Sequence, residues 1–277
     1  MNQIVAVYNF KGGVGKTTSS YYLSKVWSEK YRVLVIDADP QCNLTNLYKS
    51  KSGPLSKENQ TLFDYIVNFL HDRIPIVKPV EVSNNLHYIP GNYLMIDLES
   101  NYQFLEFGLS ILHKFFNHIK KDYDLVVVDC PSYFGKTVKY VLGNVDHVII
   151  PATPDIFSIK GILEMLKQLK NIPKNRPIHL LGIFFNRFRR EYIYHRKIMA
   201  LSKRLFRGLL IEKSVRTSVK INEMVEEKSV NKTEENPSHV VKDYEIIGKA
   251  ITDRLKRKQN GTKKSELKPR LRTVSAE

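Results

Sequence analysis

A glycine-rich loop that carries two lysines lies near the start of the chain. Residues 9–18 read Asn-Phe-Lys-Gly-Gly-Val-Gly-Lys-Thr-Thr, and they follow an apolar run over residues 4–8. The apolar run is typical of a buried strand, and the spacing of apolar residues after Thr17 predicts a helix to about residue 30. A strand, a glycine-rich loop and a helix N-terminus together form the arrangement in which backbone N–H groups bind phosphate. The sequence therefore predicts a nucleotide-phosphate site at this loop.

The residues of the loop have different expected tasks. The glycines let the backbone turn so that successive N–H groups converge on an anion. Lys16 is expected to reach the β- and γ-phosphates of a nucleotide, and the hydroxyl of Thr17 to hold Mg²⁺. The predicted nucleotide-binding residues of the loop are Lys11, Gly12, Gly13, Val14, Gly15, Lys16, Thr17 and Thr18. The alternative, a glycine-rich turn with solvated lysines, leaves the flanking strand and helix unexplained.

Aspartates follow two further strand-like runs. Residues 33–36 are apolar and lead into Asp37-Ala38-Asp39, and residues 125–128 are apolar and lead into Asp129. The carboxyl ends of parallel strands meet at one edge of a sheet, where open α/β folds bind their ligands. Asp129 therefore has the layout of a Walker B carboxylate near Mg²⁺. A simple helix cap is the alternative, and the phosphate loop elsewhere in the chain favours the metal role.

Strand-like runs alternate with helical spacing over most of the chain. Apolar runs at residues 86–89, 148–150 and 180–185 alternate with helical patterns at residues 104–121 and after residue 155. Repeated strand–helix units predict an α/β fold, with a doubly wound, mostly parallel sheet flanked by helices. We expect one domain over residues 1–257, built on the phosphate loop, and a basic, disordered tail over residues 258–277.

Composition argues against several other classes of protein. With 277 residues, of which 42% are hydrophobic, the chain can form one substantial core. No apolar run approaches the ~20 residues of a membrane-spanning helix, and the N-terminus lacks the layout of a signal peptide. Cys42 and Cys130 form no disulfide framework, and the histidines show no metal-ligand spacing. These features predict a cytoplasmic protein.

Positive charge is concentrated in the later part of the chain. Residues 1–186 carry 20 Lys and Arg against 16 Asp and Glu, a net charge of +4, out of +16 for the whole chain. Residues 187–277 carry 24 against 12, a net charge of +12. Such an asymmetric excess of one sign predicts a polyanionic partner, either nucleic acid or an anionic membrane surface.

Four stretches together resemble the ParA-type (Soj-like) DNA partition ATPases of the ParA/MinD superfamily of P-loop NTPases. In this superfamily the phosphate loop is a deviant Walker A motif with an additional lysine near its start. The stretches are Lys11–Thr18, Asp37–Asn43, Asp124–Ser132 and Val215–Glu223. The resemblance covers about residues 1–255. It implies Mg²⁺-dependent ATP hydrolysis, a homodimer formed with ATP, non-specific binding to DNA, and a centromere-binding ParB-type adaptor that stimulates slow hydrolysis.

The resemblance also implies roles for individual residues. Lys11, the signature lysine, is expected to reach the partner's phosphates across the dimer, so the expected catalytic residues are Lys11, Lys16 and Asp39. Asp39 is expected to position the attacking water and the Mg²⁺ shell, and the expected metal residues are Thr17, Asp39 and Asp129. Asn186 is expected to contact adenine. Because Lys11 would complete the site only in a dimer, ATP binding, dimerisation and hydrolysis are then linked. Such linkage makes a switch, which the resemblance implies acts on the nucleoid in plasmid or chromosome segregation.

A basic segment follows the last of the apolar runs. Residues 187–220 contain 11 Lys and Arg but only two acids, and their spacing predicts a helix over residues 192–207. Binding to the phosphate backbone needs many cations and no base readout. The expected DNA-binding residues are Arg189, Arg190, Arg196, Lys197, Lys203, Arg204, Arg216 and Lys220. The resemblance supports Arg216 and Lys220 as DNA-binding residues, whereas the other six are chosen for their charge alone. The alternative to DNA binding is that these cations form an ordinary solvated helix face.

Two related classes of protein compete with this interpretation. A MinD-like ATPase would position a complex at the membrane, but residues 263–272 offer only two leucines and a proline. That apolar surface is too small for a membrane-binding helix, so membrane binding is not expected. A reductase component similar to the nitrogenase iron protein would need cysteine ligands for an iron–sulfur cluster. Neither cysteine lies in a sequence context typical of such a cluster, so the partition ATPase is the favoured prediction.

Overall fold

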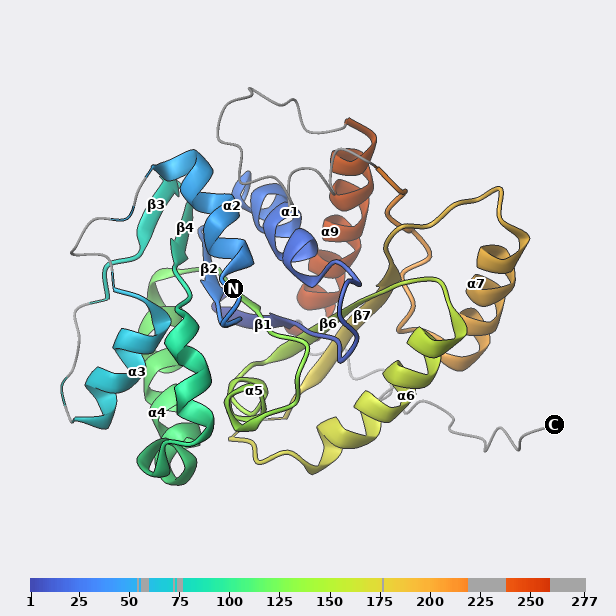
Figure 1. The fold of residues 1–277 in the computed structure, drawn as a ribbon. Helices are drawn as coiled ribbons and strands as arrows, with labels where there is room; N and C mark the ends of the chain where they lie inside the picture. The colour runs from blue at the N-terminus through green and yellow to red at the C-terminus, as the bar shows by residue number, and fades with distance from the viewer. Residues whose placement is uncertain are drawn as a thin grey trace.

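A seven-stranded sheet runs through the middle of the molecule (Figure 1). The computed structural model describes residues 1–53, 55, 60–71, 73, 77–175, 177–218 and 238–259. The strands are β1 (Gln3–Val7), β2 (Val33–Asp37), β3 (Val80–Ser83), β4 (Leu86–Ile89), β5 (Leu125–Asp129), β6 (His147–Ala152) and β7 (His179–Phe185). Their order in the sheet is β3-β4-β2-β5-β1-β6-β7. Only the pairing of β3 with β4 is antiparallel among these strands, so the predicted doubly wound, mostly parallel α/β fold is confirmed.

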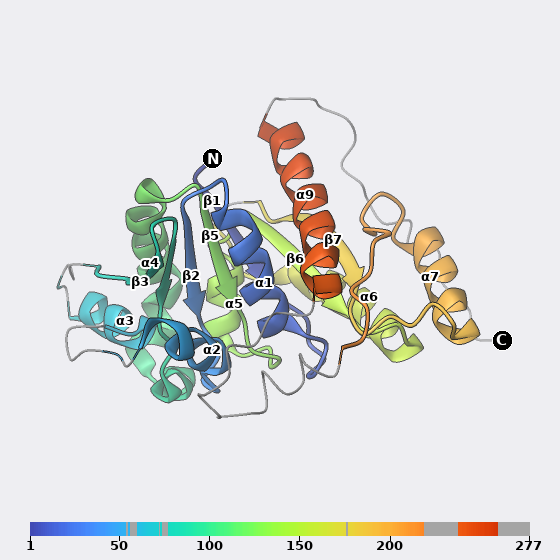
Figure 2. The ribbon, with the colours of Figure 1, turned by 90° about the horizontal axis from the view of Figure 1, so that it is seen from above.

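Helices cover both faces of the sheet. The α-helices are α1 (Lys16–Ser28), α2 (Asn43–Ser52), α3 (Leu62–Leu70), α4 (Tyr102–Ile119), α5 (Lys136–Leu142), α6 (Ile156–Asn171), α7 (Ile193–Leu205) and α9 (Ser238–Gln259). Two short 3₁₀ helices, η1 (Tyr93–Glu99) and η2 (Lys120–Asp122), flank α4. Helices α1, α2 and α9 pack on one face, which is turned toward the viewer in Figure 2. Helices α3 to α7 pack on the other face.

The strands contribute to two hydrophobic cores, one on each face of the sheet. Ile4 and Ala6 of β1 face the core under α3 to α7, whereas Val5 and Val7 face the core under α1, α2 and α9. Successive side chains of a strand point to opposite faces, and all four of these side chains are fully buried. A strand that is covered on both faces needs an unbroken apolar run, which explains why the sequence shows no alternation there.

Helix α9 is an element that the sequence interpretation above does not predict. Its inner face consists of Val240, Tyr244, Ile247 and Ile251, all of which are buried. Their spacing of four, three and four residues is typical of one helix face, so a signal for this helix is present in the sequence. Helix α9 packs along α1, and Trp27 Nε1 of α1 donates a hydrogen bond to the carbonyl oxygen of Gly248 at 3.2 Å.

The register of the central strands places their polar ends at one edge of the sheet. Asp129 at the end of β5 lies opposite Val7 of β1 on one side and opposite Asp37 of β2 on the other. The glycine-rich loop leaves β1 directly after Val7, at the same edge. The sheet thus brings the loop together with Asp37 and with Asp129, the latter more than a hundred positions further along the chain.

Candidate nucleotide-binding site

The glycine-rich loop has a backbone that two of its glycines make possible. Gly13 has φ of 71° and Gly15 has φ of 86°, both in the left-handed region that favours glycine. A Cβ atom on Gly15 would also lie 2.6 Å from Nδ2 of Asn186, closer than a non-bonded contact allows. The loop then leads into α1 at Lys16. Both the turn and the contact with Asn186 therefore require glycine at position 15.

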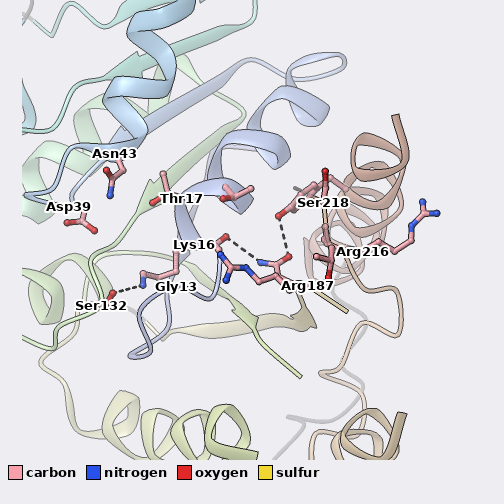
Figure 3. Close-up of a pocket in the computed structure, with 15 residues that line it drawn as sticks. Gly13, Lys16, Thr17, Asp39, Asn43, Ser132, Arg187, Arg216 and Ser218 are labelled. Atoms are coloured by element: carbon pink, nitrogen blue, oxygen red, sulfur yellow. Dashed lines mark hydrogen bonds between the residues drawn. The ribbon is translucent and has the colours of Figure 1, made fainter. Parts of the chain in front are cut away.

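A cavity opens beside this loop (Figure 3). Among the described residues, its lining consists of Gly13, Gly15, Lys16, Thr17, Thr18, Asp39, Asn43, Ser132, Asn186, Arg187, Val215, Arg216, Thr217, Ser218 and Tyr244. The phosphate loop, Asp39 and Ser132 form one side of the cavity, and the segments after β7 and α7 form the other. Of the predicted loop residues, Lys11, Gly12 and Val14 lie outside this lining. Val14 is fully buried.

The ammonium group of Lys16 is buried at the base of the cavity. Only 7% of the residue is exposed, and its Nζ donates to Oγ of Ser132 at 2.8 Å and to the carbonyl oxygen of Lys11 at 3.4 Å. Burial lowers the pKa of Lys16, and the nearby charges of Asp129 and Asp39 act in the opposite direction. A buried cation with only neutral hydrogen-bond partners is well suited to bind an anion such as a phosphate group.

Thr17 and Asp129 form a direct contact at the start of α1. Thr17 Oγ1 donates to one carboxylate oxygen of Asp129 at 2.7 Å, and Ser20 Oγ donates to the other at 2.8 Å. No group of three or more His, Cys, Asp or Glu side chains able to hold a metal is found within the described ranges. Mg²⁺ with a nucleotide usually keeps waters and takes few protein ligands besides phosphate oxygens. The hydroxyl of Thr17 and the carboxylate of Asp129 fit such an ion.

The carboxyl group of Asp129 lies in an environment that disfavours its negative charge. Burial and the neighbouring charge of Asp37 raise the pKa of Asp129 to about 8, although the hydrogen bonds from Thr17 and Ser20 act against this rise. The group thus binds its proton more tightly in the folded chain than in the unfolded one. Its contribution to stability is present below the unfolded pKa of ~3.9 and is lost as pH rises toward 8.

We therefore expect the nucleotide-free chain to melt at a lower temperature at pH 8 than at pH 5, and Asp129→Asn to remove part of this decline. At pH 8 the variant should be more stable by at least ~1 kcal/mol, or roughly 2–4 °C in a chain of this size. Thermal unfolding of both proteins between pH 5 and 8, without nucleotide or divalent ions, measures the difference. Parallel curves for the two proteins would contradict the assignment of this pH dependence to Asp129.

Asp37 and Asp39 have different surroundings although they are two positions apart. Asp37 is fully buried and accepts hydrogen bonds from the backbone N–H and the hydroxyl of Thr45 at 2.8 and 2.6 Å. Burial raises the pKa of Asp37 to about 6, and the bonds from Thr45 oppose the rise. Asp39 lines the cavity, and one of its carboxylate oxygens accepts from the backbone N–H of Gln41 at 2.9 Å. Asp37 therefore holds the loop, and Asp39 faces the cavity.

Lys11 is turned away from the cavity of its own chain. Its Nζ lies 2.8 Å from a carboxylate oxygen of Asp155, and it also donates to the hydroxyls of Thr153 at 3.2 Å and Ser158 at 3.3 Å. Partial burial would raise the pKa of Asp155, but the hydrogen bonds from Lys11 and its neighbours lower it to about 2. Asp155 is also the N-cap of α6. The two lysines of the loop thus point to different places.

Asn186 and Tyr244 brace the loop from the far side of the cavity. Asn186 Nδ2 donates to the carbonyl oxygen of Val14 at 2.8 Å, and Tyr244 OH lies 3.1 Å from Oγ of Ser19. Tyr244 OH also donates to Oδ1 of Asn186 at 3.3 Å. Asn186 lines the cavity, and the adenine contact expected for it remains a prediction. Tyr244, which the sequence interpretation missed, lies on α9, 225 residues after Ser19.

The predicted DNA-binding residues fall into three groups. Six of them are exposed on α7 or just before it: Arg189, Arg190, Arg196, Lys197, Lys203 and Arg204. Lys203 pairs with Glu212 at 2.9 Å, and Arg189 lies against the ring of Tyr192. Arg216 binds the buried carboxylate of Asp243, which offsets its charge. Lys220 lies outside the described residues, as do residues 260–277 of the predicted tail.

The surroundings of the two cysteines concern the iron–sulfur alternative, and the character of the helices concerns the membrane alternative. The thiol of Cys130 is buried in a hydrophobic core, and burial raises its pKa well above the ordinary value. Cys42 is half-buried, and burial together with the charges of Asp37 and Asp39 raises its pKa to about 11. Both shifts disfavour the thiolate form that binds iron. Among the described helices, none is long and apolar enough to cross a membrane.

Comparison with known proteins places the chain in a family. Residues 2–180 match the AAA-domain family. The sporulation initiation inhibitor protein Soj of Bacillus subtilis is 26% identical over 231 residues, which cover 80% of this chain and 87% of that protein. The virulence plasmid ParA family protein pGP5-D of Chlamydia psittaci is 25% identical over 254 residues, with 91% and 95% covered.

A solved structure shares the fold of this chain. The plasmid partition protein of Borrelia burgdorferi, crystallised with AMPPNP, superimposes with a TM-score of 0.73 at 21% identity. The superposition covers 92% of this chain and 99% of that one. The chain therefore belongs to the AAA-domain family and, within it, to the ParA-type partition ATPases.

Proposed function

We propose that this protein is a Mg²⁺-dependent ATPase that dimerises with ATP and binds DNA without sequence preference as a dimer. ATP hydrolysis, stimulated by a ParB-type adaptor, then returns the protein to the monomer and releases DNA. The placement of Lys11 carries this proposal. The cavity of its own chain is lined without it, and its ammonium group is held by the carboxylate of Asp155 instead. A lysine so placed is available to a triphosphate presented by a second copy.

The remaining chemistry of the site follows from this chain's own residues. Lys16 and the backbone of the glycine-rich loop bind the phosphates, and Thr17 and Asp129 hold Mg²⁺, which neutralises phosphate charge when bound. Asp39 faces the cavity beside the phosphates, where it orients the attacking water. Phosphoryl transfer depends mainly on positioning and on neutralising charge, so a cation supplied in trans by Lys11 completes the site. Hydrolysis then depends on dimerisation.

The contacts of Asp155 support a link between the nucleotide site and the basic surface. Asp155 caps α6, and the next residue, Ile156, donates its backbone N–H to the hydroxyl of Tyr194 in α7 at 3.1 Å. Transfer of Lys11 from Asp155 to a phosphate changes the charge at the N-terminus of α6, next to this contact. The exposed cations of α7 would therefore respond to the nucleotide.

DNA retention with different nucleotides tests the proposed function. We expect retention on immobilised duplex DNA with ATP but not with ADP, equal for unrelated sequences. Retention should weaken with salt by ~0.9 log units per neutralised phosphate per log unit of salt. Asp39→Ala should block turnover and stay bound. The pair Arg196→Ala and Lys197→Ala, both exposed on α7, should lower the salt slope by about two, whereas Lys160→Ala on α6 should not.

Absence of any ATP-dependent retention in a sample that binds ATP would refute DNA binding as the output. If the protein with ATP is retained on vesicles of anionic lipid and not on DNA, a MinD-like membrane-positioning ATPase would be favoured.

A further inference from the structure

Two consecutive residues of α9 reach two different walls of the cavity. Asp243 and Tyr244 are both buried, with 0% and 1% of each residue exposed. Tyr244 stacks on Tyr22 of α1 with ring centroids 5.0 Å apart, and its hydroxyl contacts Ser19 and Asn186 beside the phosphate loop. Asp243 points instead to the segment of residues 213–218. Helix α9 is therefore in contact with both sides of the site.

Asp243 binds the segment of residues 213–218 through four hydrogen bonds or ion pairs. Arg216 donates its backbone N–H and its Nε to Oδ2 at 3.0 and 2.9 Å, and its Nη2 donates to Oδ1 at 3.0 Å. Lys213 Nζ lies 2.5 Å from Oδ1. Burial would raise the pKa of Asp243, but its bonds with Arg216 and Lys213 outweigh burial and lower it. The carboxylate is thus charged, buried and matched by two cations from one segment.

Within the described part of the chain, few other bonds hold this segment in place. It forms no helix or extended strand. Val215 exchanges two backbone hydrogen bonds with the end of β7 and the chain just after it, donating to Phe185 at 2.8 Å and accepting from Phe188 at 3.0 Å. Beyond Val215, the bonds from Arg216 to Asp243 and to the carbonyl oxygen of His239 attach the segment to α9. The guanidinium of Arg216 points away from the cavity, while the segment itself lines it (Figure 3).

The position of this segment defines what it would contact. Lys16 and Thr17 fix the phosphates on the side of Asp39 and Ser132. Ser218 lies on the opposite side of the cavity from Asp39 and Ser132 (Figure 3), and Val215 and Thr217 of the same segment also line the cavity. A nucleotide whose phosphates occupy the loop would extend from there into the cavity, and residues 215–218 line the part of it away from Asp39 and Ser132. We therefore place these residues beside its ribose or base rather than its phosphates.

We propose that Asp243 is a positioning residue, which fixes residues 215–218 as the nucleoside-side wall of the cavity through Arg216 and Lys213. This inference rests on the proposed binding of ATP in the cavity and goes beyond it. Removing the carboxylate leaves two cations of the segment without their partner and frees the backbone N–H of Arg216. The wall then loses its fixed position, while the phosphate loop, which Asp243 does not contact, keeps its geometry.

The test compares ATP with inorganic tripolyphosphate, which has the phosphates but no nucleoside. Dissociation constants are measured by calorimetry for wild type, Asp243→Asn and the control Asp253→Asn, an exposed aspartate of the same helix. We expect Asp243→Asn to weaken ATP binding by ~10-fold and tripolyphosphate binding by less than twofold, and Asp253→Asn to change neither. If Asp243→Asn does not fold, Arg216→Gln, at a half-exposed side chain, should show the same selective loss to a smaller degree.

The outcomes separate the two proposals. An equal loss for both ligands, or no loss of ATP binding, would overturn the role of Asp243 and leave the ATPase proposal intact. A wild-type protein that binds tripolyphosphate but shows no preference for ATP would also overturn it. A folded wild-type protein that binds neither ligand would overturn the proposed function itself.

Discussion

Lys16→Ala is expected to abolish nucleotide binding, with a loss of affinity of at least ~100-fold. Lys16 is almost completely buried, and its ammonium group donates to Ser132. The group therefore has little water to lose when phosphates bind it. Charge-assisted hydrogen bonds in such an environment contribute about 1.5–3 kcal/mol each, and a loss of about 2.7 kcal/mol corresponds to 100-fold. Titration with a fluorescent ATP analogue in the presence of Mg²⁺ measures the change.

The matched control for this prediction is Lys30→Ala, an exposed lysine just beyond the end of the same helix. It removes the same charge from the chain and should leave the affinity within about twofold. Thermal unfolding establishes that both variants are folded. If Lys16→Ala binds ATP within tenfold of wild type, the phosphates do not occupy the loop, and the nucleotide lies elsewhere in the chain.

Lys11→Ala is expected to separate nucleotide binding from its consequences. The side chain of Lys11 does not line the cavity of its own chain, so the affinity of the monomer for ATP should stay within about threefold. The ATP-dependent dimer and DNA retention should fall below detection, because the variant lacks the cation that we propose contacts the partner's phosphates. Hydrolysis should fall with them, since a cation supplied in trans contributes a factor of roughly 10³–10⁵ in related phosphoryl-transfer sites.

Lys160→Ala is the matched control for Lys11→Ala. Lys160 is exposed on α6, the helix that Asp155 caps, and its removal changes the local charge by the same amount. It should retain the dimer and DNA binding. If Lys11→Ala hydrolyses ATP and dimerises as wild type does, Lys11 has no role in trans, and its ion pair with Asp155 is only structural.

The local features of the site could be predicted from the sequence. The glycine-rich loop, the aspartates at the ends of β2 and β5, and the order of strands and helices each arise from patterns within about ten residues. Parallel strands then bring Asp37 and Asp129 to one edge, which general rules of α/β folds anticipate. For these residues, the position expected from the local sequence pattern is the position that they take in the fold.

Contacts between distant segments could not be predicted in the same way. Tyr244 and Asp243 reach the cavity only because α9 returns to pack on α1, and no local pattern ties Tyr244 to Ser19. Arg216 shows the same limit. Its charge and its place in the family motif predict DNA contact, but its guanidinium binds Asp243, 27 residues further along the chain. The direction of Lys11 also depends on Asp155, 144 residues away.

The particle mass in solution with each nucleotide tests the central claim most directly. Multi-angle light scattering of the Asp39→Ala variant, which should hold ATP without turnover, compares saturating ATP with saturating ADP. We expect one chain of 32.2 kDa with ADP and twice that mass with ATP. A variant that binds ATP yet remains a single chain at all protein concentrations would contradict the account, because no second copy would then receive Lys11.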